Sequence, residues 1–160
     1  MRIPILGIAP VRTNGTMALV TRNHPKLTLE GARAVLAAAE RRAIEIKIPM
    51  DIAVVDDGGH LLAFARMDGA KISSVQIAVL KAHSAAIRRK PSGPALTGDQ
   101  PNILLSLSLA IGSAAQQTPI RGGLPLEVDG QCVGAIGVSN GTEEEDLDVA
   151  RAGAAALAKA

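Results

Sequence analysis

Four charged side chains are placed where they could bind a small anion. Arg66 and Asp68 follow directly after a run of residues that favours a β-strand, and Arg121 precedes Gly122-Gly123. Lys81 falls near the apolar face of a predicted helix, where a charged group is costly unless it reaches a partner or a pocket. Arginine offers a planar fork that suits a carboxylate, and lysine offers a point charge. If the helix packs across the strand ends, Arg66, Lys81 and Arg121 converge on a pocket for an anionic ligand.

A structural interpretation of the same residues stays open. Arg66 could pair locally with Asp68, Lys81 could extend its ammonium group to solvent, and Arg121 could lie on the surface. In an enzyme, by contrast, Lys81 or Asp68 would be the catalytic group that moves a proton. A lysine beside two arginines has its pKa lowered, so it could act as a base near neutral pH.

The three histidines, His24, His60 and His83, do not have the spacing of a metal site. Each could still serve singly as an axial ligand of haem. His83, on the second predicted helix, and His24, near the N-terminus, are the two candidates that we retain. A haem pocket also needs a broad apolar wall, which this chain would build from aliphatic residues between subunits. The cofactor is therefore unknown, with haem possible.

Other catalytic patterns are missing from the sequence. It has no nucleophile elbow, zinc-protease motif, paired cysteines, phosphate-binding loop or dinucleotide fingerprint. The single cysteine, Cys132, lies in a strand-like run and is predicted to fill the core. Glu144 and Asp148 are spaced to chelate a cation, but the acidic turn is better explained as a partner of the helix dipole. No metal site is predicted.

Composition sets limits on fold and partners. A chain of 160 residues fits one domain. Its net charge is only +2, and Phe64 is its single aromatic residue, so it lacks the basic and base-stacking surface of a nucleic-acid binder. We recognise no secretory signal or membrane span, and we expect a cytoplasmic protein without a membrane partner.

The C-terminal third has the clearest local pattern. Asp129-Gly130 links two β-favouring runs, Leu124 to Val128 and Gln131 to Val138, and predicts a hairpin with a type I′ turn. Thr142 and Glu145 then form a capping box, which opens a helix. This stretch is therefore a hairpin followed by a helix that can lie back on the sheet.

The preceding chain shows a related arrangement. Thr28 is an N-cap for a helix of about five turns that ends before Pro49. The remaining predicted elements are strands over 51–56 and 60–66, a helix whose apolar face runs over 72–86, a short helix over 102–111, and a strand over 116–121. Hairpin-linked strands imply an antiparallel sheet covered by the helices, so the predicted class is α+β in a single domain.

Residues 1–27 are interpreted as an N-terminal arm, and residues 28–160 as the domain. The arm contains Pro4, Pro10 and Pro25 and shows no sustained period. Its apolar residues favour an extended segment that packs on a neighbouring subunit.

Several segments, in one order, resemble the GlcG/HbpS-like family, which includes the C-terminal domain of PduO-type proteins. They are LTLEGA at 27–32, AVVDDGGHLLAFARMDGAK at 53–71, Lys81-Ala82, GGLPL at 122–126 and VGAIGVSN at 133–140. The resemblance covers about residues 28–157. Ser84 stands where the family has threonine, and Asn140 where it has glycine.

The resemblance implies a profilin-like sheet of five antiparallel strands flanked by helices, and homo-oligomers from dimers to octamers. It implies association with haem or corrinoids. It also gathers six ligand-binding residues into one pocket: Arg66, Asp68, Lys81, Arg121, Gly122 and Gly123.

Three functions follow as hypotheses. The favoured one is an oligomeric small-molecule-binding protein that holds an anionic or planar ligand, either haem or a small carboxylate. The alternative is a catabolic enzyme, namely a tautomerase, hydrolase or dehalogenase acting on unsaturated carboxylic acids from aromatic degradation. The third is a structural or partner-binding subunit.

Overall fold

The computed structural model of the chain describes residues 12–13, 16–17 and 24–157. The helices are α1 (Leu29–Glu45), α2 (Ser74–Arg88), α3 (Ile103–Gly112) and α4 (Glu143–Ala154). The strands are β1 (Arg12–Thr13), β2 (Thr16–Met17), β3 (Asp51–Asp56), β4 (Leu61–Arg66), β5 (Leu96–Thr97), β6 (Gln100–Pro101), β7 (Gly123–Val128) and β8 (Gln131–Ser139). Most of the predicted arm lies outside the described residues, so its packing on a neighbour stays a prediction.

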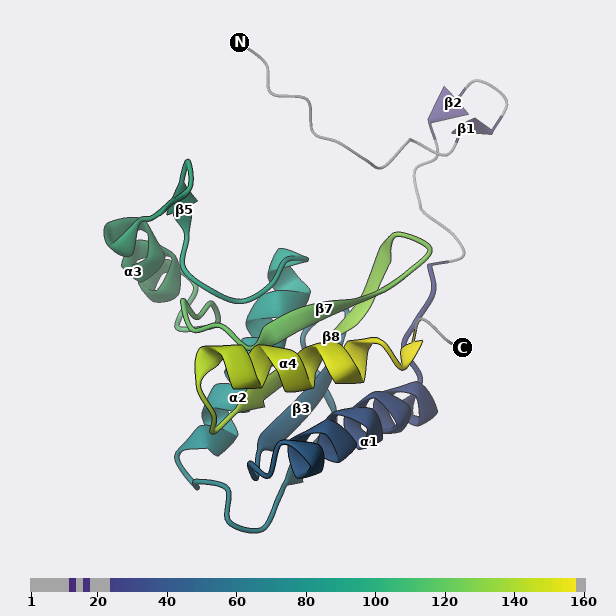
Figure 1. The fold of residues 1–160 in the computed structure, drawn as a ribbon. Coiled ribbons are helices and arrows are strands. Elements are labelled where there is room, and N and C mark those ends of the chain that lie inside the picture. Colours follow the sequence, from purple (N-terminus) through teal and green to yellow (C-terminus); the bar gives the residue numbers. More distant parts are fainter. Residues whose placement is uncertain (1–11, 14–15, 18–23, 158–160) are drawn as a thin grey trace.

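The main sheet has four antiparallel strands in the order β4-β3-β8-β7. Helices α1 and α4 cover one face, and α2 covers the other (Figure 1). Along β3, Ile52 and Val54 face α1 and α4, while Ala53 and Val55 face α2. This alternation is the period-two pattern of a strand buried on both faces, and it confirms the predicted α+β class.

The layer beneath α2 is built almost entirely from small residues, and Gly137 sets its thickness. A Cβ atom on Gly137 would overlap the carbonyl oxygen of Ala78 and the nitrogen of Ala82. Ala78 and Ala82 are both fully buried against the sheet. The glycine in this strand therefore serves close packing of the helix on the sheet.

The C-terminal hairpin and helix form as predicted. Asp129 and Gly130 have φ values of 51° and 73°, as a type I′ turn requires. The Glu145 N–H donates to Thr142 Oγ1 over 3.3 Å, and the Thr142 N–H donates to Glu145 Oε2 over 2.8 Å. The capping box is thus confirmed at the start of α4.

The predicted strand over 116–121 is wrong, and the sheet therefore has four strands rather than five. Pro119 has no N–H to donate to a neighbouring strand. The nearby backbone groups form hydrogen bonds with side chains instead. The Thr118 N–H donates to Ser84 Oγ, and Ser92 Oγ donates to the Ile120 carbonyl. Gly122, with φ of 120°, then separates this segment from β7.

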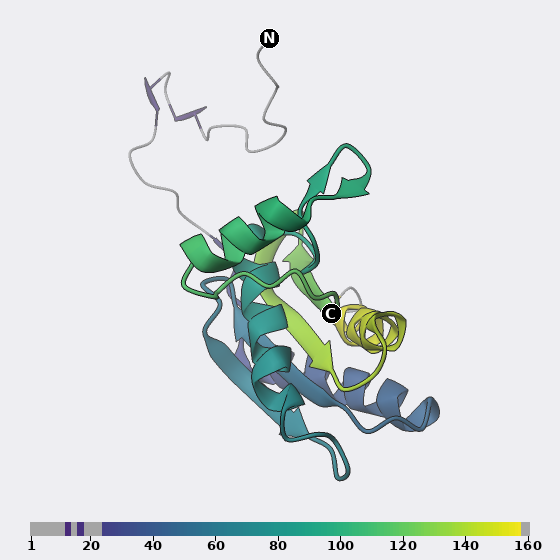
Figure 2. The same cartoon turned by 90° about the vertical axis from the view of Figure 1, so that its left-hand side faces the viewer.

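Helix α3 and the β5–β6 hairpin lie apart from the sheet and its three covering helices (Figure 1), and in Figure 2 the hairpin projects from the upper end of the molecule. The helix confirms the short one predicted over 102–111, and Asn102 caps it by accepting from the Leu105 N–H. Within the described residues, no helix is long and apolar enough to cross a membrane.

Candidate functional site

Most of the predicted anion-binding residues lie at one end of the sheet, but at opposite edges. Arg66 ends β4, and Gly123 begins β7. Across the sheet, Arg66 lies opposite Asp51, and Asp51 lies opposite Ser139. Because β3 and β8 lie between β4 and β7, the two edges are separated by about 14 Å, three times the spacing of neighbouring strands. The predicted set therefore divides into two groups.

The first group contains Arg66 and Asp68, which are exposed and line a common pocket. The pocket has a volume of about 290 Å³, and the segment 66–72 that leads into α2 supplies its wall. No ion pair joins Arg66 to Asp68 in the part of the chain that the structure describes. Both side chains are thus available to a ligand.

The second group is organised around Lys81, which is only 1% exposed. Its Nζ donates to Asp146 Oδ2 over 2.6 Å and to the Val138 carbonyl over 2.9 Å. The Gly141 N–H donates to the other Asp146 oxygen over 3.0 Å. Burial raises the pKa of Asp146, and the Lys81 ammonium opposes that rise. Lys81 thus joins α2 to β8 and α4, and ligand binding by Lys81 would require this pair to open.

Gly122 and Gly123 make room for this ion pair. A Cβ atom on Gly123 would overlap the Lys81 carbonyl oxygen, and one on Gly122 would lie 2.9 Å from Lys81 Nζ. Arg121, just before them, is exposed, and its Nε lies 3.7 Å from Glu143 Oε2. The glycines are therefore accounted for by packing around Lys81, and their contact with a ligand stays a prediction.

His24 has both ring nitrogens engaged. Its Nδ1 lies 2.8 Å from Gln131 Oε1, and its Nε2 lies 3.3 Å from Asp57 Oδ2. Lys26 donates to the same Asp57 carboxylate over 2.7 Å, and this hydrogen bond is the main reason why the Asp57 pKa is lowered. His24 is consequently the weaker of the two predicted haem ligands.

His83 is arranged differently. Its Nδ1 lies 2.9 Å from the Gly59 carbonyl oxygen, which can only accept, so Nδ1 donates and the neutral ring has its lone pair on Nε2. Nε2 is buried and has no hydrogen-bond partner among the described residues. Histidines that ligate metals commonly have the second nitrogen fixed in this way by a carbonyl. His83 therefore offers an oriented donor atom.

Apolar residues on β4 and α2 flank His83. Val79 and Ile87 lie one turn before and after it on α2. On β4, Leu61 and Phe64 lie opposite Val55 and Ala53, which face α2. Because α2 packs mainly on β3, β7 and β8, this side of β4 stays partly open, and Leu61 and Ile87 are exposed. The result is an apolar strip beside the histidine, with Arg66 at its far end.

Asp51, which no sequence pattern marked as a site residue, is fully buried at the start of β3. Neither carboxylate oxygen has a hydrogen-bond partner within the described ranges. Its cross-strand neighbours are Arg66 and Ser139. Burial raises the pKa of Asp51, and the charge of Arg66 opposes this rise. A buried carboxyl group with no partner is expected to destabilise the fold when it is ionised.

Replacing Asp51 with Asn is therefore expected to change the pH dependence of stability. Because the folded-state pKa is raised, the free energy of unfolding of the wild type should fall as the pH rises above about 3.8, its ordinary value, toward the raised value. The variant lacks this fall and should be more stable at pH 7, by roughly 1–3 kcal/mol. Urea unfolding of both proteins from pH 3 to 8 measures this difference, and parallel curves would contradict it.

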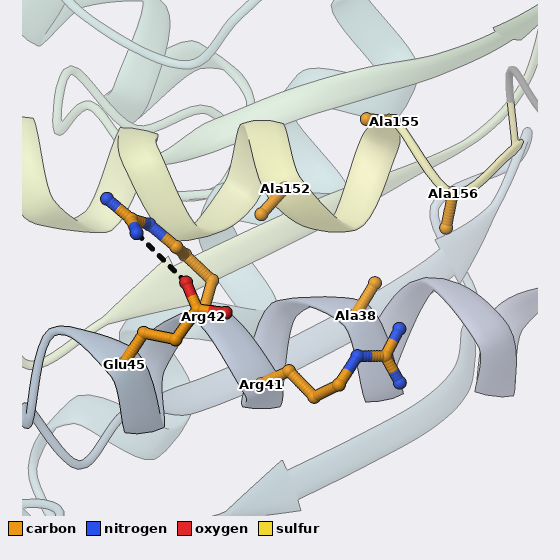
Figure 3. Close-up of a pocket in the computed structure, with 7 residues that line it drawn as sticks. All are labelled: Ala38, Arg41, Arg42, Glu45, Ala152, Ala155 and Ala156. Carbon is orange, nitrogen blue, oxygen red and sulfur yellow. Dashed lines mark hydrogen bonds and ion pairs between the residues drawn. The ribbon is translucent and has the colours of Figure 1, made fainter.

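A second hollow, of about 360 Å³, lies between α1 and α4 (Figure 3). One wall is formed by Ala152 of α4 and by Ala155 and Ala156, which directly follow this helix. The other wall is formed by Arg41, Arg42 and Glu45 of α1. Arg42 donates to Glu45 over 3.0 Å and to Asp148 over 2.8 Å. Asp148 is thereby occupied, which argues against the cation site considered at Glu144 and Asp148.

Comparison with known proteins identifies related chains over most of the length. The family model for "haem degrading protein HbpS-like" matches residues 27–155. Protein GlcG of Escherichia coli K12 is 39% identical over 133 residues, which are 83% of this chain and 96% of GlcG.

Two solved structures are also similar. Klebsiella pneumoniae protein ORFY has a TM-score of 0.80 and 30% identity, over 91% of this chain and 99% of its own. A complex of PduOC with haem has a TM-score of 0.70 and 26% identity, over 82% of this chain and 95% of its own.

Proposed function

We propose a function from the premise that this chain belongs to the HbpS-like family. The proposed function is the binding of a planar, anionic small molecule, haem, with His83 as an axial ligand. Self-association between a dimer and an octamer is part of the same proposal. PduOC, a relative of similar fold, has been solved with haem, which supports this choice of ligand.

The observation that carries the proposal is the unpartnered Nε2 of His83. The hydrogen bond from Nδ1 to the Gly59 carbonyl orients the ring and leaves the Nε2 lone pair for a metal. Gly59 is required for this approach, because a Cβ atom there would overlap Nδ1 of His83. His83 would therefore hold the haem iron through Nε2 once the side chains that bury this atom move aside, and haem would supply that iron.

The surroundings of His83 suit a flat apolar molecule with an anionic edge. Leu61 and Phe64 offer apolar contact on the α2 side of β4, and Arg66 follows on the same side of the strand. From Leu61 to Arg66 the strand extends roughly 16 Å. Arg66 would pair with a carboxylate at the edge of the ligand, which retains the predicted role of this residue as a charge partner.

A small carboxylate is the second candidate ligand. The observation that favours it is the pocket of about 290 Å³ in which Arg66 and Asp68 are both free of ion pairs within the described residues. An enzyme acting on such acids would use Asp68 there as its proton-transfer group. Lys81 would be a poor base in that reaction, because it already donates to Asp146.

A haemin titration of the purified protein, followed by visible absorption, tests the proposal. The wild type should saturate at a fixed ratio of haemin to chain, and His83→Ala should weaken binding by tenfold or more, because the metal loses its protein ligand. His24→Ala is the matched control and should bind as the wild type does, since both ring nitrogens of His24 are engaged.

Two outcomes would reject haem held by His83. Non-saturating binding that neither variant changes would show adsorption without a site. Equal loss in both variants, with both still folded by circular dichroism, would show that binding does not depend on His83 in particular. In either case, small dicarboxylates should be tested by calorimetry against Arg66→Ala, with Arg33→Ala, an exposed arginine of α1, as the control.

A further inference from the structure

Helix α3 presents an unusually apolar surface. Its sequence, ILLSLSLAIG, contains no charged residue. The most exposed of its large side chains are Ile103 (81%), Leu104 (76%), Ile111 (71%) and Leu107 (55%). Leu96, in the adjacent β5–β6 hairpin, is 54% exposed. A contiguous apolar surface of this kind on a globular domain marks an interaction site.

These residues have the spacing of a helix–helix interface. Leu104, Leu107 and Ile111 are separated by three and four residues, as in the apolar seam of packed helices. The opposite side of α3 faces the segment just before β5, because Ser106 is buried there and accepts from the Ala95 N–H over 2.9 Å. The seam thus points away from the protein's own core.

Local hydrogen bonds fix the start of the helix against the segment just before β5. Asn102 caps it by accepting from the Leu105 N–H over 2.8 Å, and the Asn102 N–H donates to the Ala95 carbonyl over 2.8 Å. Ser106 Oγ donates to the Asn102 carbonyl over 2.7 Å. A preorganised helix loses little conformational freedom when it docks.

The absence of charge decides which partner this surface fits. Residues 100–120 contain no Lys, Arg, Asp or Glu. Helices that lie on membranes carry basic residues on their polar face, and α3 offers none. A two-fold interface requires a patch that is complementary to itself, and an uncharged apolar helix meets that requirement because its copy introduces no like-charge repulsion.

We propose that α3 packs against α3 of a second copy of this chain, in an antiparallel two-fold pair centred on Leu107. The inference rests on the self-association proposed above and names the surface responsible. It predicts that the pair buries Leu104, Leu107 and Ile111 from both copies, and that charge introduced into this seam separates them.

Sedimentation velocity of the full chain tests this pairing. Leu107→Glu should reduce the sedimenting mass at least twofold relative to the wild type, because it places two like charges in a desolvated interface. Ile44→Glu is the matched control: Ile44 is 64% exposed on α1, a helix that lies away from α3 (Figure 1), and the variant should assemble as the wild type does. Circular dichroism of each variant checks that it remains folded.

Self-crosslinking gives a second readout that does not depend on destabilisation. Under mild oxidation, Leu107→Cys should form a disulfide with its copy, whereas Ile44→Cys should not, and the native Cys132 is buried. A monomeric wild type, or unchanged assembly in Leu107→Glu together with no crosslink in Leu107→Cys, would overturn the pairing.

Flotation of the wild type with neutral or anionic lipid vesicles would assign α3 to a membrane instead. Haemin binding by the Leu107→Glu protein shows separately whether the ligand site survives.

Discussion

Replacing Lys81 with Met is expected to lower the free energy of unfolding by about 3–5 kcal/mol, the usual loss when one member of a buried ion pair is removed. The change would leave Asp146 buried, with only the Gly141 N–H as a donor. It would also remove the donor to the Val138 carbonyl. Domains are stable by only about 5–15 kcal/mol in total, so this one substitution should be readily detected by urea unfolding at pH 7.

The double variant Lys81→Met/Asp146→Asn distinguishes the loss of the pair from the loss of packing. Asn can still accept from the Gly141 N–H but carries no buried charge, so the double variant should regain at least half of the stability lost by Lys81→Met. Asp146→Asn alone should also destabilise, because it leaves the Lys81 ammonium without its counter-charge.

Lys81 would be assigned to the ligand site by a different result. Unchanged stability in Lys81→Met, combined with loss of haemin or carboxylate binding, would show that the lysine serves the ligand and not the fold.

Replacing Gly137 with Ala should destabilise the protein by about 1–3 kcal/mol or more, the usual cost of overpacking a core. The added methyl would overlap the Ala78 carbonyl oxygen and the Ala82 nitrogen. These are backbone atoms of α2, so the helix as a whole would have to move away from the sheet. Thermal unfolding should show a lower midpoint than in the wild type.

Gly112→Ala is the matched control for this substitution, because no described atom lies within 4 Å of the position its Cβ would take. Gly112 is the last residue of α3. Alanine is favoured over glycine within a helix by up to about 1 kcal/mol. The control should therefore be as stable as the wild type or slightly more. Equal destabilisation by both substitutions would contradict the close approach of α2 at Gly137.

Local signals explain what the sequence predicted well. The Asp129-Gly130 turn and the Thr142 capping box each depend on residues within four positions of one another, and both form. The strand predicted over 116–121 fails because side chains of Ser84 and Ser92, distant in sequence, satisfy its backbone. The residues of that segment alone did not reveal this competition.

The site depends on contacts that sequence spacing does not encode. The partner of Lys81 is Asp146, 65 residues away. His83 and His24 were equivalent candidates in the sequence. They differ only because His83 contacts a backbone carbonyl 24 residues away, while His24 contacts Gln131, 107 residues away. No sequence pattern marked Asp51, because its burial without a partner depends on the strands that pair with β3 on both sides.

Resonance Raman spectroscopy of the reduced haem complex tests the central claim most directly, because the iron–histidine stretching band reports the axial bond itself. The proposal predicts this band in the wild type and in His24→Ala, and its loss in His83→Ala. A band that persists unchanged in His83→Ala, or its absence from a saturated, five-coordinate ferrous wild-type complex, would contradict the assignment of His83 as the axial ligand.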